Sequence, residues 1–143
     1  MARGETIKLV DGGRQKRAFT YIDDGVDALM KIIANPGGIA SRKIYNIGNP
    51  RNNYSVRALA EMMVSLALEY PEYRGTARKV RIKRTTAERY YGRGYQDVQN
   101  RVPGIASTRR ELGWKPRVGM RQALQLIFEA YRSQIADARK LVG

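Results

Sequence analysis

The chain has 143 residues, a net charge of +14, and neither cysteine nor histidine. Those two absences exclude disulfides, thiol nucleophiles, Ser-His-Asp triads and metal sites built on Cys or His, while the charge favours an anionic partner. No apolar run approaches the roughly 20 residues that cross a bilayer, and the N-terminus lacks the apolar region of a signal peptide, so we expect one cytoplasmic domain without membrane insertion.

The first predicted elements are two extended segments joined by a glycine turn. Residues 6–10 alternate polar and apolar side chains as a half-buried strand does, and residues 17–22 resume a β-rich pattern. Between them, Asp11-Gly12-Gly13 provides the backbone freedom of a tight turn. The sequence therefore predicts a hairpin with a basic tip.

Three longer helices are predicted from caps and from apolar residues at helical spacing. The first begins at Asp23 or Asp24 and ends at Pro36-Gly37-Gly38, the second is capped by Ser55, and the third begins near Met120. Their apolar stripes are Val26, Leu29, Met30 and Ile33; then Val56, Leu59, Ala60, Met63, Ala67 and Leu68; then Met120, Ala123, Leu124, Ile127, Phe128, Tyr131 and Ile135. Stripes of this kind indicate core packing.

Shorter segments complete the pattern. Residues 43–47 and 80–82 are predicted strands because they are β-branched or alternate in polarity. A short helix is predicted from Ser107 or Thr108, with Glu111 placed as the partner in a capping box, and Gly113 stops it.

Two polar clusters have residue types that bind anions. The first surrounds the Gly12-Gly13 turn and contains Lys8, Arg14, Gln15, Lys16 and Arg17. Glycine lets backbone N–H groups approach an anion, and guanidinium forks match phosphate oxygens in pairs. The turn suits a diphosphate, although an ordinary basic hairpin tip has the same composition.

The second cluster lies in residues 90–103, where Arg93 and Arg101 alternate with Tyr91 and Tyr95. Aromatic faces can stack on a base while arginines hold charged oxygens. A surface loop whose tyrosines lie against the core is the alternative. No dinucleotide fingerprint, Walker-type loop or Tyr-x-x-x-Lys pair is present, so the sequence shows no nucleotide-cofactor site and no general base.

Several stretches resemble one enzyme family in order and spacing. Residues 12–20 (GGRQKRAFT), Asp24-Gly25, residues 45–50 (YNIGNP) and residues 112–116 (LGWKP) resemble the C-terminal half of extended short-chain NAD-dependent epimerase/dehydratases. Within that superfamily, residues 90–98 (YYGRGYQDV) are similar to the decarboxylating UDP-glucuronic acid dehydrogenases of polymyxin resistance.

The resemblance implies an α/β fold: the C-terminal portion of a Rossmann-like domain, with short strands and about four helices. Residues 1–143 would form a single substrate-binding lobe. The N-terminal half, which in the family holds NAD, the Tyr-x-x-x-Lys pair and an acidic catalytic residue, would be a missing partner. We therefore expect this chain alone to be inactive and prone to association, and the full-length protein to be a homo-oligomer.

The resemblance also implies a reaction and a site. NAD-dependent oxidation at C4 of UDP-glucuronate is followed by loss of carbon dioxide, giving a UDP-4-keto-pentose for aminoarabinose modification of lipid A. Arg101 would be the catalytic residue; because a guanidinium hardly gives up a proton, we expect it to stabilise the enolate electrostatically, with water relaying the proton. The UDP-sugar would be bound by Lys8, Leu9, Val10, Asp11, Gly12, Gly13, Arg14, Gln15, Lys16, Arg17 and Tyr95.

Two other hypotheses remain. The chain could be the same lobe of another nucleotide-sugar epimerase or dehydratase, because only residues 90–101 separate these substrates. A basic nucleic-acid binding module would account for the charge and for the alternating Tyr and Arg, but no named nucleic-acid motif is present, so we rank it last.

Overall fold

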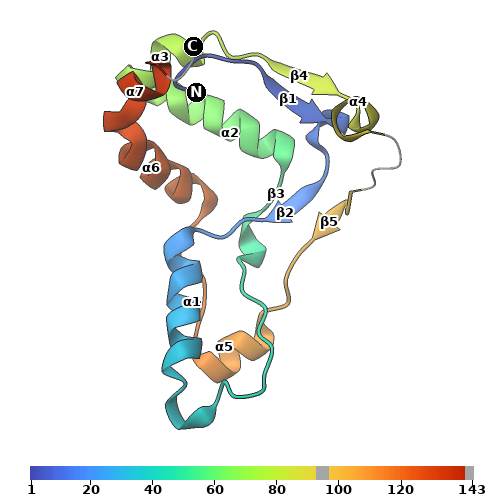
Figure 1. The fold of residues 1–143 in the computed structure, drawn as a ribbon, viewed down its shortest axis with the longest axis vertical. Helices are drawn as coiled ribbons and strands as arrows, with labels where there is room; N and C mark the ends of the chain where they lie inside the picture. The colour runs from blue at the N-terminus through green and yellow to red at the C-terminus, as the bar shows by residue number, and fades with distance from the viewer. Residues whose placement is uncertain (93–96, 141–143) are drawn as a thin grey trace. The chain divides into compact units, whose positions relative to one another are not determined.

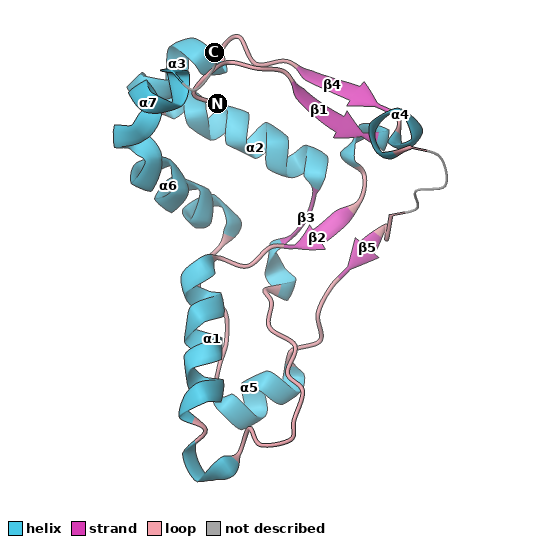
Figure 2. Ribbon diagram, viewed as in Figure 1, coloured by secondary structure: helices cyan, strands magenta, loops and turns pink. Residues whose placement is uncertain are grey.

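The computed structural model describes residues 1–92 and 97–140, which fold into two compact units (Figure 1). Unit 1 comprises residues 1–15, 55–99 and 121–143, and unit 2 comprises residues 16–54 and 100–120. Both contain short strands and helices (Figure 2), so the predicted α/β class is confirmed. No helix of the described residues is long and apolar enough to cross a membrane.

Unit 1 combines a two-stranded parallel sheet with helices. Strand β1 (Ile7–Val10) pairs with β4 (Ile82–Thr85), so that Leu9 lies opposite Arg84. The helices are α2 (Val56–Glu69), α3 (Pro71–Ala77), α4 (Ala87–Tyr91), α6 (Met120–Tyr131) and α7 (Ile135–Lys140).

Caps and aromatic contacts fix the helices of unit 1. The Ser55 hydroxyl accepts a hydrogen bond from the Ala58 N–H at 3.0 Å, which confirms the predicted cap of α2. The ring of Tyr73 meets that of Phe128 edge to face at 4.8 Å, and its hydroxyl donates to the Phe128 carbonyl. This contact joins α3 to α6, and it needs a helix at 71–77 that apolar spacing did not indicate.

Unit 2 is built around a small sheet and two helices. Strand β2 (Lys16–Ala18) lies between β3 (Asn53–Ser55) and β5 (Asn100–Arg101), and α1 (Ile22–Ala34) and α5 (Ala106–Leu112) supply the helices. Its core gathers Ala28, Ala40, Leu112 and Trp114, with Ile32, Tyr45, Ile47 and Ile105 against them.

Several predicted elements are wrong. There is no hairpin, because β1 pairs with β4 and β2 pairs with β5, both in parallel. Residues 43–47 form no strand: Tyr45 and Ile47 face the core, but the segment has no neighbouring strand to pair with among the described residues. The last helix is interrupted at residues 132–134 by a 3-10 turn before α7.

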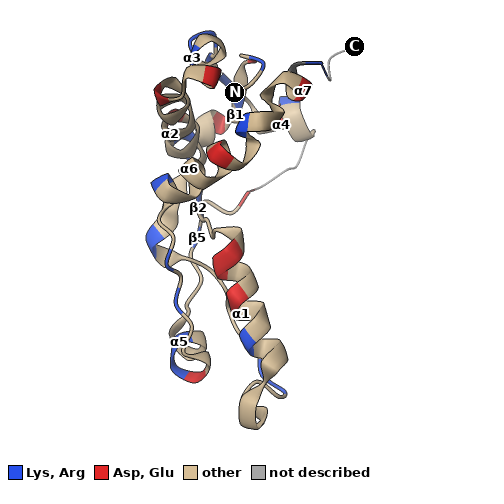
Figure 3. Cartoon of the chain, turned by 90° about the vertical axis from the view of Figure 1, so that its left-hand side faces the viewer, with Lys and Arg blue, Asp and Glu red and all other residues tan. Residues whose placement is uncertain are grey.

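The first helix also differs from its prediction. It begins at Ile22, so Asp23 and Asp24 lie in its first turn instead of capping it. There the two carboxylates still oppose the positive end of the helix dipole, and Figure 3 shows acidic residues in the N-terminal part of α1. The predicted inward stripe of Val26, Leu29, Met30 and Ile33 is exposed, and Ile33 is 73% exposed. Ile22, at the start of the helix, is exposed as well.

Asp24 is the buried polar residue that organises unit 2. Its carboxylate accepts hydrogen bonds from the backbone N–H groups of Arg117 and Val118 at 3.0 to 3.1 Å. Its backbone carbonyl accepts the indole N–H of Trp114 at 2.9 Å. One residue of α1 therefore holds the segment 114–118 through contacts at residues 114, 117 and 118.

We expect Asp24→Ala to lower the free energy of unfolding by about 2–4 kcal/mol, because it leaves two partly buried N–H groups without an acceptor. Chemical unfolding followed by the fluorescence of Trp114, the chain's single tryptophan, measures the loss. Asp27→Ala, on the exposed side of the same helix, is the matched control and should change stability by less than about 0.5 kcal/mol. Equal effects of the two substitutions would contradict this role of Asp24.

Candidate functional site

The predicted substrate-binding segment, residues 8–17, is divided between the two units: residues 8–15 belong to unit 1, and Lys16 and Arg17 belong to unit 2. In unit 1, β1 leads into a 3-10 turn at Asp11–Gly13. The Asp11 carboxylate accepts the Ala87 N–H at 3.1 Å, and the Gly12 carbonyl accepts Arg57 Nε at 3.1 Å. The turn is therefore held by the first residues of α4 and α2.

Gly13 is required by packing. Its φ is +66°, and a Cβ at this position would lie 2.9 Å from the backbone nitrogen of Arg57. A side chain would therefore meet both backbone strain and a clash with α2. The sequence suggested glycines that let an anion approach, whereas the described contact at Gly13 is with a neighbouring helix.

Two further arginines lie beside this turn. A Cβ at Gly12 would be 3.8 Å from Cδ of Arg84 and 4.0 Å from a terminal nitrogen of Arg57. The register of β1 and β4 also places Lys8 opposite Lys83. Arg84 is brought to the turn by the pairing of β1 with β4, and Arg57 by the contact of α2 with the Gly12 carbonyl. The sequence does not indicate this cluster, since Arg57 and Arg84 lie about 45 and 72 residues from Gly12.

In unit 2, the structure brings together Arg17 and Arg101. They are register partners in the parallel strands β2 and β5, one residue beyond the pair Lys16 and Asn100. Register partners on neighbouring strands, about 4.8 Å apart, project to the same face of a sheet. The Arg17 guanidinium also donates to the Lys16 carbonyl at 2.7 Å. Two arginines on one face of a sheet concentrate positive charge there, and guanidinium groups match phosphate and carboxylate oxygens, so this face suits an anionic ligand.

A neighbouring polar pair was not anticipated. The Asn53 amide on β3 donates to the Asn100 side-chain oxygen at 3.2 Å. The Asn53 side-chain oxygen is itself buried and, among the described residues, has no hydrogen-bond partner. A buried acceptor of this kind can bind a donor from a ligand or a water.

The structure describes only part of the predicted cluster of Tyr and Arg residues between residues 90 and 95. Tyr95 and Arg93 lie outside the described residues. Tyr90 and Tyr91, at the end of α4, are about half exposed, and their rings meet edge to face at 4.8 Å. They therefore do not lie buried against the core of unit 1. No group of three acidic residues among those described could hold a metal ion.

The predicted capping box is wrong, because Glu111 and Thr108 have other hydrogen-bond partners. Glu111 accepts hydrogen bonds from Lys43 Nζ, the Tyr45 hydroxyl and Arg110, each at 2.9 Å. These donors, Lys43 first, lower the pKa of Glu111 from 4.5 to about 2. The contact raises the pKa of Lys43. The Thr108 hydroxyl donates instead to the Asn46 carbonyl at 2.7 Å, so α5 is fastened to residues 43–46 on two sides.

The lowered pKa of Glu111 predicts an acid-dependent stability. Because the folded-state pKa is below the ordinary value, the stabilisation is complete above pH 4.5 and is lost as the pH falls toward about 2. We expect Glu111→Gln to reduce the dependence of the unfolding midpoint on pH across that range, as measured by Trp114 fluorescence. Glu61→Gln, which removes one exposed ion pair with Arg57, should leave the dependence unchanged. An unaltered profile in Glu111→Gln would contradict the assignment.

Known proteins match the chain in sequence and in fold. Residues 1–48 match the model of the NAD dependent epimerase/dehydratase family, and this range contains all of residues 8–17. The crystal structure of PbgP3 protein from Burkholderia pseudomallei matches with 55% identity and a TM-score of 0.84, covering 99% of this chain and 39% of that one. These matches support the NAD dependent epimerase/dehydratase family for this chain.

Two more distant structures share the fold of this chain. UDP-glucose 4-epimerase from Thermotoga maritima, solved with UDP-glucose, has 24% identity and a TM-score of 0.66, with 94% of this chain and 37% of that chain covered. RMD from Pseudomonas aeruginosa, complexed with NADPH, has 18% identity and a TM-score of 0.60 over 90% of this chain and 36% of that chain. The chain thus spans less than half the length of each of these three proteins.

Proposed function

We propose that this chain is the UDP-sugar-binding part of an NAD-dependent UDP-glucuronate dehydrogenase that also decarboxylates its product. The observation that carries the proposal is the pairing of Arg17 with Arg101 on neighbouring strands. The resemblance of residues 90–98 supports the choice of substrate, since that motif is similar to the dehydrogenase domain of the bifunctional polymyxin resistance protein ArnA. The 55% identity to PbgP3 over nearly the whole chain is compatible with it.

The chemistry needs positive charge at two places on the substrate. UDP-glucuronate carries a diphosphate and a C6 carboxylate, and in this proposal Arg17 binds the diphosphate while Arg101 faces the reacting end of the sugar. Bound NAD supplies the oxidation at C4. Once C4 is a ketone, the carboxylate at C5 leaves as carbon dioxide and its bonding electrons form an enolate, which Arg101 stabilises. Water then delivers a proton to C5, because guanidinium stays charged at neutral pH.

The cofactor site is assigned to a separate N-terminal half. A Rossmann-type NAD site needs a glycine-rich turn between a strand and a helix, with the diphosphate at the start of that helix. In the described residues, the glycine turn at Asp11–Gly13 leads from β1 to another strand, β2. These residues do not fit the cofactor, so we place NAD on the partner half and expect this chain alone to be inactive.

The apolar face of α1 is where we propose that this partner docks. Ile22, Val26, Leu29, Met30 and Ile33 recur at helical spacing and are exposed. Ile44, on the neighbouring irregular segment of unit 2, is 94% exposed. An apolar surface of this kind is normally covered by protein, and the Rossmann-type half of a complete family member provides apolar helices and strands to cover it.

Binding of UDP-glucuronate tests the site. We expect Arg17→Ala and Arg101→Ala each to weaken binding, measured by isothermal titration calorimetry, by about tenfold or more, because each removes a charge-assisted hydrogen bond. Lys31→Ala, which removes a half-buried lysine from α1, outside the predicted substrate site, should bind as the unaltered chain does. Equal affinity in all three variants, or absence of saturable binding, would overturn the proposal. Tighter binding of UDP-glucose would favour another epimerase or dehydratase.

Association tests the docking face separately. We expect the isolated chain to self-associate with increasing concentration in sedimentation velocity, and Ile33→Lys to shift it toward monomer, because a charge on the stripe opposes apolar contact. Asp27→Asn on the polar side of α1 changes the net charge by the same amount and is the control. A monomer at every concentration, with cooperative melting and high solubility, would show that this face needs no partner.

A further inference from the structure

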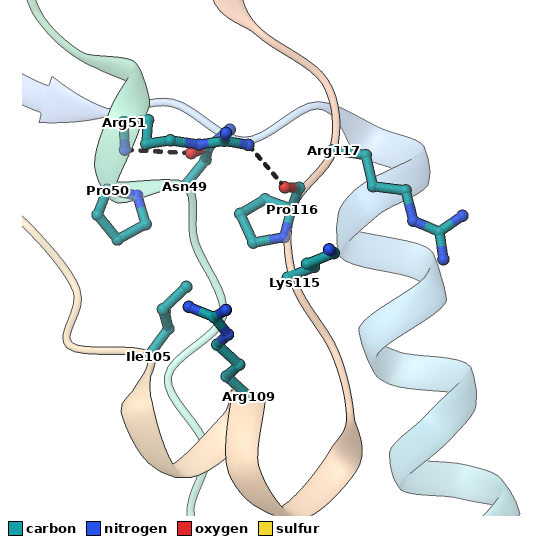
Figure 4. Close-up of a pocket in the computed structure, with 8 residues that line it drawn as sticks. All are labelled: Asn49, Pro50, Arg51, Ile105, Arg109, Lys115, Pro116 and Arg117. Carbon is teal, nitrogen blue, oxygen red and sulfur yellow. Dashed lines mark hydrogen bonds between the residues drawn. The ribbon is translucent and has the colours of Figure 1, made fainter.

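A cationic pocket in unit 2 is not accounted for by the proposed substrate site. Its volume is about 600 Å³, and it lies between α5 and the loops at residues 49–51 and 115–117 (Figure 4). The residues that line it are Asn49, Pro50, Arg51, Ile105, Arg109, Lys115, Pro116 and Arg117. None of them belongs to the predicted UDP-sugar site, so the pocket is a separate feature of the chain.

The charged residues that line the pocket are all positive. Four residues are cations and none is an acid. Within the described part of the chain, the side chains of Arg109 and Lys115 make no hydrogen bond or ion pair, whereas the adjacent Arg110 is paired with Glu111 at 2.9 Å. Figure 4 shows Arg109 rising from α5 toward Ile105, between that residue and Lys115. Positive charge without counter-charge in a concave site attracts a multivalent anion.

The uncharged part of the lining limits the kind of anion. Pro50, Ile105 and Pro116 supply apolar surface beside the cations. Inorganic phosphate would leave this surface unused, whereas a molecule with both a phosphate group and a planar apolar part would cover both. The volume falls within the range of about 300–1,000 Å³ that is typical of small-ligand sites. A nucleotide has this size and this division of polarity.

Hydrogen bonds hold one wall of the pocket, formed by residues 49–51 and 116–117. Asn49 is fully buried; its amide donates to the Val118 carbonyl at 3.0 Å and its oxygen accepts the Arg51 N–H at 3.1 Å. Arg51 donates from its guanidinium to the Pro116 carbonyl at 3.0 Å. Asp24 holds Arg117 from the other side. A wall that is held in this way loses little conformational entropy on binding, which favours affinity for a ligand that fits.

We propose that this pocket is a second anion site of the protein, and that it binds a nucleotide of the size of ADP. The phosphates lie against Arg109 and Lys115, whose charges are otherwise unpaired among the described residues, and the base lies against Pro50, Ile105 and Pro116. The site would use two of the 27 Lys and Arg residues that give the chain its net charge of +14. It is independent of the reaction proposed for Arg101.

Titration with fluorescently labelled ADP at physiological salt tests the proposal. We expect saturable binding of labelled ADP. Unlabelled adenosine and pyrophosphate should each displace it more weakly than unlabelled ADP does, because adenosine lacks the phosphates and pyrophosphate lacks the base. Arg109→Ala and Lys115→Ala should each weaken binding by about tenfold, and Arg109→Lys by less. Arg110→Ala, adjacent on α5 but paired with Glu111, is the matched control and should retain the affinity.

Four results would overturn the proposal. They are absence of saturable ADP binding, equal losses in Arg110→Ala and Arg109→Ala, loss of ADP binding in Arg101→Ala, and displacement of ADP by a single-stranded oligonucleotide that binds more tightly. The third would mean that ADP occupies the UDP-sugar site, and the fourth that the surface binds nucleic acid. Failure of UDP-glucuronate to bind, with ADP binding intact, would contradict only the proposed function.

Discussion

The carboxylate of Asp24 is the constraint on which unit 2 depends. A buried carboxylate is stable only when donors surround it, and here the donors are the backbone N–H groups of Arg117 and Val118. The same residue receives the indole of Trp114 through its carbonyl. Because residues 114–118 are fixed in this way, Asn49 and Asn52 can both donate to the Val118 carbonyl, each at 3.0 Å. Hydrogen bonds through Asp24 and the Val118 carbonyl thus connect α1, the turn at residues 49–52 and the loop at residues 114–118.

Positive charge is used in different ways in different parts of the chain. Arg57 and Arg110 are engaged by carbonyl or carboxylate groups, so their charge contributes to structure. Arg17 and Arg101 share one face of a sheet, and Arg109 and Lys115 line a pocket without an acidic neighbour among its lining residues. These two places concentrate positive charge on one surface, and they are therefore where anionic ligands are proposed.

Local signals predicted some elements well. Residues 7–10 and the helix capped by Ser55 follow from alternation, helical spacing and a hydroxyl cap, all of which act within a few residues. The hairpin failed because a glycine turn permits a hairpin but does not choose the partner of each strand. Residues 43–47 have strand polarity, yet a strand requires a neighbour, and none lies beside them in the described residues. The stripe of α1 was identified correctly as apolar, but its exposure could not be read from spacing.

The sequence by itself determined the chemistry that is possible: no thiol or imidazole, abundant guanidinium, and a basic turn with motifs similar to one enzyme family. Tertiary structure decided which of these groups act together. The register of β2 and β5 sets Arg17 beside Arg101, 84 residues apart in the chain, and the contacts of Asp24 bring residues 49–51 and 115–117 around one pocket. Neither arrangement has a local sequence signal, because strand pairing and burial depend on segments that meet only after folding.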